Sequence, residues 1–222
     1  PLNARTAVVV KYRRKQAALP ETDPRRFNPV YAAMIEAVDT SIGGIVKQVD
    51  ELGLSESTLI IFTSDNGGAI QSQLSPLRGM KDSLFEAGIR VPTCMRWTGT
   101  IKPEEKCKTP ITGVDFLPTF SSLAGAKISN TQPVDDVDLS PLLIGQSIAD
   151  RAIFWHFPLY LPGHGLDVDL SNNENYSWRG FPSTVLRRGD WKLIEYLENN
   201  TIRLLNLKDD PSKATDLAIA MP

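Results

Sequence analysis

The sequence predicts an α/β fold followed by a small antiparallel β subdomain, and three observations support this prediction. Residues 29–52 carry apolar side chains at alternating three- and four-residue steps, which is typical of one apolar stripe along a helix. Residues 57–64, "STLIIFTS", form an apolar run without alternation, as in a strand covered on both faces in a parallel sheet. Residues 183–207 hold three short strand patterns separated by Gly189-Asp190 and Asn199-Asn200 turns, as in an antiparallel meander.

Glycines and prolines delimit the elements of the N-terminal part. Residues 1–30 predict a short helix around "KYRRKQ" and an irregular lead-in broken by prolines. Gly43 and Gly44 lie inside the long helix, where each costs about 1 kcal/mol relative to alanine, so we expect close packing against the backbone there. Gly53 predicts a left-handed residue after the end of this helix.

A change in sequence texture indicates the domain organisation. Residues 90–97 predict a second strand, and "GVDFLPTFSSLAG", residues 113–125, predicts a helix ended by its final glycine. The stretch that follows is rich in turn residues, so we place a boundary near residue 126. Residues 1–126 then form the main α/β part, and residues 127–222 form a linker and the small antiparallel subdomain.

Composition excludes several classes of function. With 24 basic and 26 acidic residues the formal charge is -2, so neither nucleic acid nor an anionic membrane is an expected partner, and an anionic substrate would need a local cationic cluster. No apolar run is long enough to span a membrane. Cys94 and Cys107 are too few for a disulfide framework and lack zinc-site spacing, so we expect buried thiols.

The motif that follows the apolar run is a candidate metal site. In an α/β sheet ligands bind beyond the carboxyl ends of the strands, which is where Asp65 and Asn66 lie if the run is a parallel strand. Both side chains offer hard oxygen donors suited to Ca²⁺ or Mg²⁺, and Gly67 and Gly68 let the backbone approach a ligand. The same sequence also favours a tight turn for purely conformational reasons.

The next stretch, "PLRGMKDSLFEAGIRVP", adds two cations close to the predicted metal ligands. Arg78 and Lys81 beside a divalent metal would form a pocket for a tetrahedral oxyanion such as sulfate or phosphate. Either residue taken singly is more often a solvated surface charge. Glu86 is most simply an ion-pair partner for Arg78 or Arg90.

These motifs together resemble a known family. "YAAMIEAVDTSIGGIVKQVDELGLSESTLIIFTSDNGG", "PLRGMKDSLFEAGIRVP", "GVDFLPTFSSLAG" and "RRGDWKLIEYLENNTIRLLNLKDDPSKATDLA" are similar, in order, to the C-terminal half of type I sulfatases in the alkaline phosphatase superfamily. The resemblance implies the C-terminal part of an alkaline-phosphatase-like sandwich. It also implies that Asp65 and Asn66 are two ligands of an active-site Ca²⁺ and that Lys81 contacts the sulfate or the bridging oxygen.

Other parts expected of that family are absent from the sequence. Its nucleophile is a formylglycine made from a C/S-x-P-x-R motif, and neither "TCMRW" nor "KCKTP" fits. The acidic pair that supplies further metal ligands is also absent, so we expect a missing N-terminal half as partner and weak or no metal binding by this chain alone. The compartment stays open, with a periplasmic or secreted location expected if that half carries a signal peptide.

Three functional hypotheses follow. The first is a Ca²⁺-dependent sulfatase acting on a sulfate ester, with a sulfated glycan as one substrate class, in which this chain supplies metal- and sulfate-binding residues. The second is a non-catalytic binding or assembly protein. The third, within the same superfamily, is hydrolysis of phosphodiesters or phosphonates with similar metal ligands.

Overall fold

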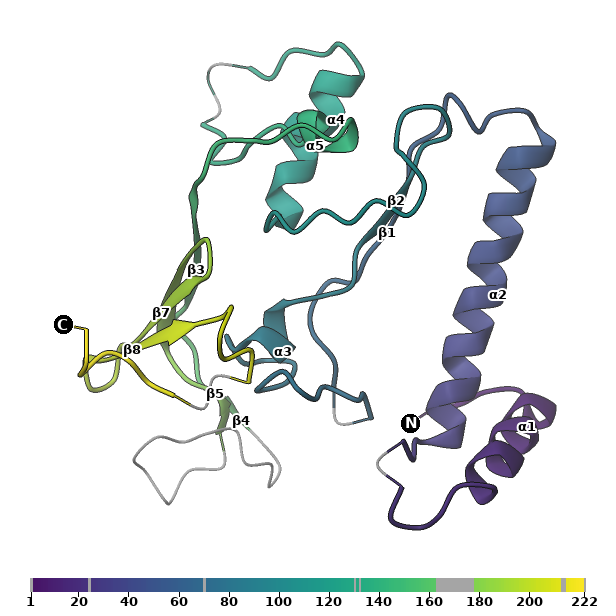
Figure 1. The fold of residues 1–222 in the computed structure, drawn as a ribbon, viewed down its shortest axis with the longest axis horizontal. Helices are drawn as coiled ribbons and strands as arrows, with labels where there is room; N and C mark the ends of the chain where they lie inside the picture. The colour runs from purple at the N-terminus through teal and green to yellow at the C-terminus, as the bar shows by residue number, and fades with distance from the viewer. Residues whose placement is uncertain are drawn as a thin grey trace. The chain divides into compact units, whose positions relative to one another are not determined.

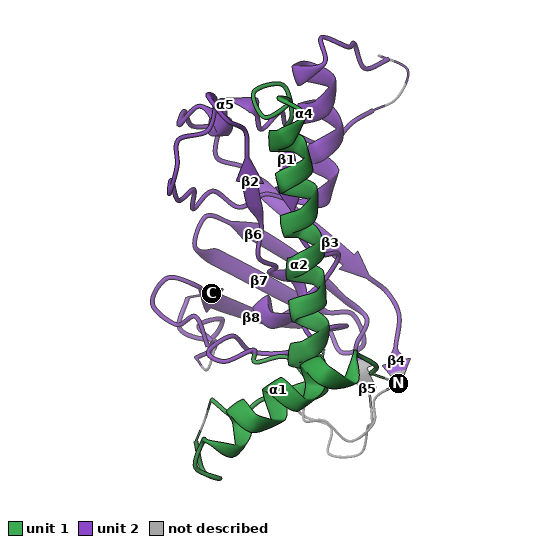
Figure 2. Ribbon diagram, turned by 90° about the vertical axis from the view of Figure 1, so that its right-hand side faces the viewer, with its two compact units in different colours: residues 1–59, 69–73 green, residues 60–68, 74–222 purple. Residues whose placement is uncertain are grey.

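The computed structural model describes residues 2–23, 25–69, 71–129, 131, 133–162, 178–212 and 215–221. The chain divides into two compact units, which Figure 2 colours separately. The first unit contains residues 1–59 and 69–73, and the second contains residues 60–68 and 74–222. The boundary near residue 126 stays a prediction.

The first unit consists mainly of two helices, α1 (Thr6–Ala17) and α2 (Pro29–Glu51). Helix α2 begins where the sequence predicts, because the Asn28 side chain accepts hydrogen bonds from the N–H groups of Val30 and Tyr31. Past its end, Gly53 has a φ of 69°, which confirms the predicted left-handed residue. Both helices expected in this region are therefore present (Figure 1).

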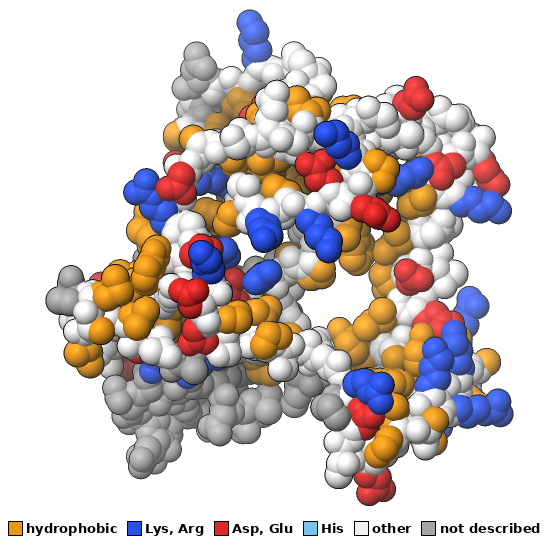
Figure 3. All heavy atoms as spheres, in the orientation of Figure 1, with side chains coloured by type: hydrophobic (Ala, Val, Ile, Leu, Met, Phe, Trp, Pro, Cys, Tyr) orange, Lys and Arg blue, Asp and Glu red, His pale blue; other side chains and the backbone are white. Residues whose placement is uncertain are grey.

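The apolar stripe of α2 is largely exposed to solvent. Ile35, Val38 and Ile45 are 52%, 52% and 60% exposed, and hydrophobic side chains gather along one side of this helix in Figure 3. The expected close packing at Gly43 and Gly44 is wrong for the described residues, because a Cβ at either position would meet nothing within 4 Å. Periodicity shows which face of a helix is apolar but not what covers it.

The second unit opens with a two-stranded sheet of β1 (Ile60–Phe62) and β2 (Cys94–Arg96). The strands pair antiparallel with Ile61 opposite Met95, so the parallel neighbour expected from the apolar run is wrong for the described part of the chain. Phe62 is 41% exposed, and the strand is not covered on both faces. Cys94 and Cys107 are exposed free cysteines, contrary to the expected burial.

Four short helical segments follow in this unit: α3 (Glu86–Ile89), the 3-10 turn η1 (Gly113–Asp115), α4 (Phe116–Leu123) and α5 (Ser140–Leu143). The helix predicted over 113–125 is thus present, and Gly125 with φ 65° follows it. Asp115 is fully buried, accepts a hydrogen bond from the Thr112 N–H and forms a bidentate ion pair with Arg151. Burial raises the pKa of Asp115, but these partners outweigh it and hold the pKa below its ordinary 3.8.

The C-terminal part is a four-stranded antiparallel sheet in the order β3-β6-β7-β8. Its strands are β3 (Ala152–Phe157), β6 (Ser183–Arg188), β7 (Trp191–Tyr196) and β8 (Thr201–Asn206), and a separate pair joins β4 (Leu161–Pro162) to β5 (Trp178–Gly180). Gly189 and Asn200 both have φ 55° in the connecting turns, which confirms the predicted meander. Among the described residues, no helix is long and apolar enough to cross a membrane.

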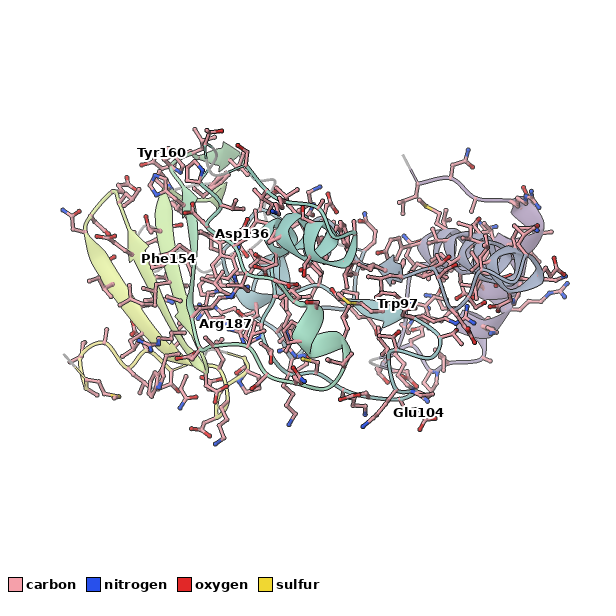
Figure 4. The ribbon with its side chains drawn as sticks, turned by 90° about the horizontal axis from the view of Figure 1, so that it is seen from above. Trp97, Glu104, Asp136, Phe154, Tyr160 and Arg187 are labelled. Carbon is pink, nitrogen blue, oxygen red and sulfur yellow. The ribbon has the colours of Figure 1, made fainter. Side chains whose placement is uncertain are left out.

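The core of the second unit lies between this sheet and the segment that leads into α3. Val185, Ile194 and Leu205 alternate with outward-facing residues on β6, β7 and β8, and Phe85 packs against them. The opposite face is open, since Phe154, labelled in Figure 4, is 65% exposed. The sheet therefore fixes the position of the loop that precedes and forms α3.

Candidate functional site

The loop that follows β1 carries the two predicted metal ligands. Asp65 is exposed and Asn66 is half-buried. The Ser64 hydroxyl lies 3.3 Å from the Asp65 carboxylate and 3.1 Å from the Asn66 carbonyl oxygen, so it closes a tight turn here. The tight turn and the pair of oxygen donors, which the sequence offers as alternatives, are compatible with each other. The exposed Asp65 carboxylate beside the Asn66 amide stays available to a ligand.

Two backbone hydrogen bonds join this loop to the segment that carries the predicted cations. The Gly67 N–H donates to the Gly88 carbonyl at 2.8 Å, and the Lys81 N–H donates to the Gly68 carbonyl at 2.8 Å. Residues 64–68 and 78–88 are thereby held side by side within one unit. The structure thus brings together the two motifs that the sequence offers as metal and anion sites.

We call the place where residues 64–68 and 78–88 meet the crossing, and glycine is required on both of its sides. A Cβ on Gly67 would lie 1.8 Å from the Ala87 carbonyl oxygen, and a Cβ on Gly88 would lie 2.0 Å from the Ser83 carbonyl oxygen. Both obstacles are backbone atoms, which cannot move aside as a flexible side chain could. The "DNGG" motif is therefore a packing requirement as well as a turn signal.

We expect Gly67→Ala to destabilise the 222-residue chain by about 1 to 3 kcal/mol, the usual cost of overpacking. The reason is the clash with the Ala87 carbonyl. Urea unfolding followed by circular dichroism measures this change. Gly43→Ala is the matched control: its new methyl group meets nothing and removes a helical glycine, so it should raise stability by up to about 1 kcal/mol. Equal stability of the two variants would contradict the crossing.

The two predicted cations differ in their surroundings. The Arg78 guanidinium lies 4.8 Å from the centroid of the Phe85 ring, and its side chain is half-buried. Lys81 is exposed. Because Phe85 belongs to the core, Arg78 is held by a cation–π contact, whereas the Lys81 ammonium can reach an anion from solvent.

The donor chemistry of the loop fits Ca²⁺ as part of a ligand set. A carboxylate and a carboxamide are the hard oxygen donors that this ion takes, but it uses 6 to 8 of them. Within the described ranges, no three His, Cys, Asp or Glu side chains come together as a metal site. Asp65 and Asn66 thus fit the ion and leave most of its ligands to be supplied by other groups.

Sequence reasoning missed the partners of Glu86. Its ion-pair role is confirmed, but the partners that the structure places come from the sheet: Lys192 Nζ at 3.1 Å and Arg187 Nη1 at 3.3 Å. The signal was present, because alternation in "WKLIEY" puts Lys192 on the same face as buried Ile194. A lysine at an inward position predicts an acidic partner.

The two histidines, His156 and His164, lie outside the two site segments in the sequence, residues 64–68 and 78–88. The apolar run "AIFWHF" predicts a hydrogen-bonded core residue at His156. The hydrogen bond is confirmed, since His156 Nδ1 lies 2.9 Å from the Thr184 hydroxyl, but the side chain is exposed on β3 and the expected burial is wrong. His164 lies outside the described residues.

Comparison with known protein families matches both parts of the chain. The "Sulfatase" family matches residues 1–126, more than half of the chain. The family described as "N-sulphoglucosamine sulphohydrolase, C-terminal" matches residues 80–220.

Individual relatives agree with this match. A sulfatase from Formosa agariphila is 31% identical over 232 residues, which cover 96% of this chain and 38% of the relative. The crystal structure of Ps i-CgsB in complex with k-i-k-neocarrahexaose superposes with a TM-score of 0.75 at 24% identity, covering 99% of this chain and 44% of that one. The structure of BT4656 with its substrate D-glucosamine-2-N,6-O-disulfate gives a TM-score of 0.65 at 21% identity, covering 96% and 41%.

The chain spans less than half the length of each of these three proteins. The two solved structures confirm the expected alkaline-phosphatase-like fold. The family match and the 31% identical relative carry the assignment: this chain belongs to the sulfatase family.

Proposed function

We propose that the complete protein hydrolyses sulfuric esters and that this chain supplies part of its metal and sulfate site. One observation carries the proposal. The loop with Asp65 and Asn66 is hydrogen-bonded, through Gly67 and Gly68, to the segment with Arg78 and Lys81. A pair of metal ligands and two cations on adjoining segments are suited to binding a tetrahedral oxyanion such as sulfate.

The metal of this proposal is Ca²⁺. The Asp65 carboxylate and the Asn66 amide oxygen would hold it, since both are hard donors on a loop that the Gly67–Gly88 hydrogen bond fixes. When bound, the ion polarises sulfate oxygens as a Lewis acid. Because the donors are already fixed before the metal binds, metal binding costs less conformational entropy.

The cations of this chain act on the sulfate group. Negative charge builds up on the sulfate and bridging oxygens as the ester bond breaks, and a preorganised cation at hydrogen-bond distance stabilises that charge. We assign this role to Lys81, whose exposed ammonium can reach the oxygens. Arg78, held over Phe85, adds a second positive charge on the same segment.

The nucleophile and the remaining metal ligands come from the N-terminal half of the complete protein in this proposal. The nucleophile in this proposal is the formylglycine that the resemblance to sulfatases implies, and this chain has no C/S-x-P-x-R motif that could supply it. The exposed apolar stripe of α2 supports a large missing partner surface, as soluble proteins rarely leave such a stripe uncovered. Sulfated glycans are the proposed substrate class, on the analogy of the D-glucosamine-2-N,6-O-disulfate bound by BT4656.

The test compares esters that share one leaving group. The complete protein is assayed with an aryl sulfate, an aryl phosphodiester and an aryl phosphonate, before and after chelation of divalent metal. We expect the sulfate to be hydrolysed with a kcat/KM at least about 100-fold above the other two. Chelation should abolish turnover, and Ca²⁺ should restore it.

The other outcomes are equally informative. A preference for the phosphodiester or phosphonate would replace the sulfatase proposal with the related hydrolase. Saturable binding of a sulfated oligosaccharide with no turnover of any ester would favour a non-catalytic binding protein.

A further inference from the structure

A buried charge cluster links the sheet to the segment that carries the candidate site. Glu86 is 2% exposed and Lys192 is fully buried, with Lys192 Nζ 3.1 Å from Glu86 Oε1. Arg187, with 20% of its side chain exposed, lies 3.3 Å from Glu86 Oε2. Lys192 also donates a hydrogen bond to the Leu84 carbonyl, so it contacts both the first and the last residue of the segment 84–86. Charged groups are almost never buried to this degree unless they are paired.

The register of the sheet explains why Glu86 must be there. Arg187 on β6 lies directly opposite Lys192 on β7, and both point to the buried face. Two like charges in opposed positions destabilise a sheet unless an opposite charge lies between them. Figure 4 labels Arg187 beside the sheet. Glu86 is therefore fixed by two strands at once, each through its own carboxylate oxygen.

Helix α3 connects Glu86 to the candidate site through backbone hydrogen bonds. Two residues after Glu86, the Gly88 carbonyl accepts the Gly67 N–H at 2.8 Å. The backbone on each side is packed without slack, since a Cβ on Gly88 would lie 2.5 Å from the Met80 carbonyl oxygen. The Ala87 N–H also donates to the Arg78 carbonyl at 3.0 Å. A shift of Glu86 thus moves the backbone of both segments of the site.

We propose that Glu86, held by Lys192 and Arg187, is a positioning residue through which the C-terminal sheet sets the register of the loop bearing Asp65 and Asn66 against the segment bearing Lys81. The proposal rests on the proposed function for its effect on turnover. Its structural content is independent of that function. It predicts that loss of the cluster loosens the site loop while the sheet stays folded.

The test uses Glu86→Gln in the complete protein, which keeps the size of the side chain and removes its charge. Hydrogen exchange is followed by mass spectrometry over residues 64–69, 78–82 and 183–206. We expect exchange at least about tenfold faster in the first two segments, with the third still protected. For the sulfate ester, kcat should fall by about 10- to 100-fold, as for other groups that orient a metal ligand.

Arg151→Met is the matched control, because it breaks another buried ion pair, with Asp115. In the described part of the chain, the other hydrogen bonds of the Asp115 carboxylate come from residues 112 and 137, which lie outside the site segments. It should lower the melting temperature and leave exchange over 64–69 and kcat unchanged. Arg187→Met is a milder second variant that leaves the Lys192–Glu86 pair in place. It keeps the test decisive if Glu86→Gln does not fold, and it should speed exchange over 64–69 by a smaller factor.

The outcomes separate the two proposals. If Glu86→Gln and Arg187→Met lower the melting temperature as Arg151→Met does but leave exchange over 64–69 at the wild-type rate, the cluster is structural and the positioning role is wrong. If exchange accelerates as expected but the wild-type protein hydrolyses no sulfate ester, the positioning role stands and the sulfatase function fails.

Discussion

Asp65→Ala in the complete protein is expected to lower kcat for a sulfate ester by about 1000-fold or more and to weaken Ca²⁺ binding. A metal contributes several kcal/mol of stabilisation to the charge of the transition state, and each 1.36 kcal/mol is a factor of ten in rate. The carboxylate is the stronger of the two donors that this chain offers. Steady-state kinetics and isothermal titration with Ca²⁺ measure both effects.

The control for this variant is Asp150→Ala. Asp150 is also an exposed aspartate, and its ion pair with Arg188 leaves both side chains about two-thirds exposed, so its loss should cost little stability or activity. Because Asp65 is exposed, Asp65→Ala should keep the wild-type melting temperature when both proteins are measured without Ca²⁺. A near-native kcat in Asp65→Ala would remove the metal role from this loop.

Elements with local signals could be predicted from the sequence. Asn28 before Pro29 and the glycine at 53 delimit α2, because a cap and a left-handed residue act within one helical turn. Gly189 and Asn200 mark the turns of the meander for the same reason, since only their own φ angles decide. The fold class was predictable because it depends on such elements in order.

Features that depend on distant partners could not be predicted. The run at residues 57–64 has no alternation, and this pattern says that a strand is apolar but not which strand pairs with it. Its observed neighbour β2 is antiparallel. Exposure of Cys94 and of the apolar stripe on α2 has the same origin, because burial depends on which other chain segments are present.

The candidate site shows the same division. Asp65, Asn66, Arg78 and Lys81 could be named from residue types and spacing. The crossing that joins them depends on the backbone hydrogen bond between Gly67 and Gly88. Residue types and their spacing do not indicate which backbone groups will be hydrogen-bonded. The Glu86–Lys192 pair joins residues 106 positions apart, so only the inward position of Lys192 pointed to it.

Lys81→Ala in the complete protein is expected to lower kcat for the sulfate ester by about 100- to 1000-fold, with a smaller change in KM. The ammonium is assigned to charge that develops in the transition state, and losing one such preorganised donor costs about this much. Lys81→Arg keeps the charge but replaces a compact ammonium with a broad planar group. The kcat of this variant should therefore lie between those of the wild type and Lys81→Ala. Steady-state kinetics at saturating metal measure all three proteins.

Lys102→Ala tests whether any exposed lysine would give the same loss. It removes the same charge from the same unit, so it should leave kcat at the wild-type value. The backbone hydrogen bond of Lys81 to Gly68 survives substitution by alanine, and exchange over residues 64–69 should therefore stay unchanged. A loss of rate with an unchanged loop assigns the effect to the ammonium itself. Full activity in Lys81→Ala would transfer the sulfate contact to another cation.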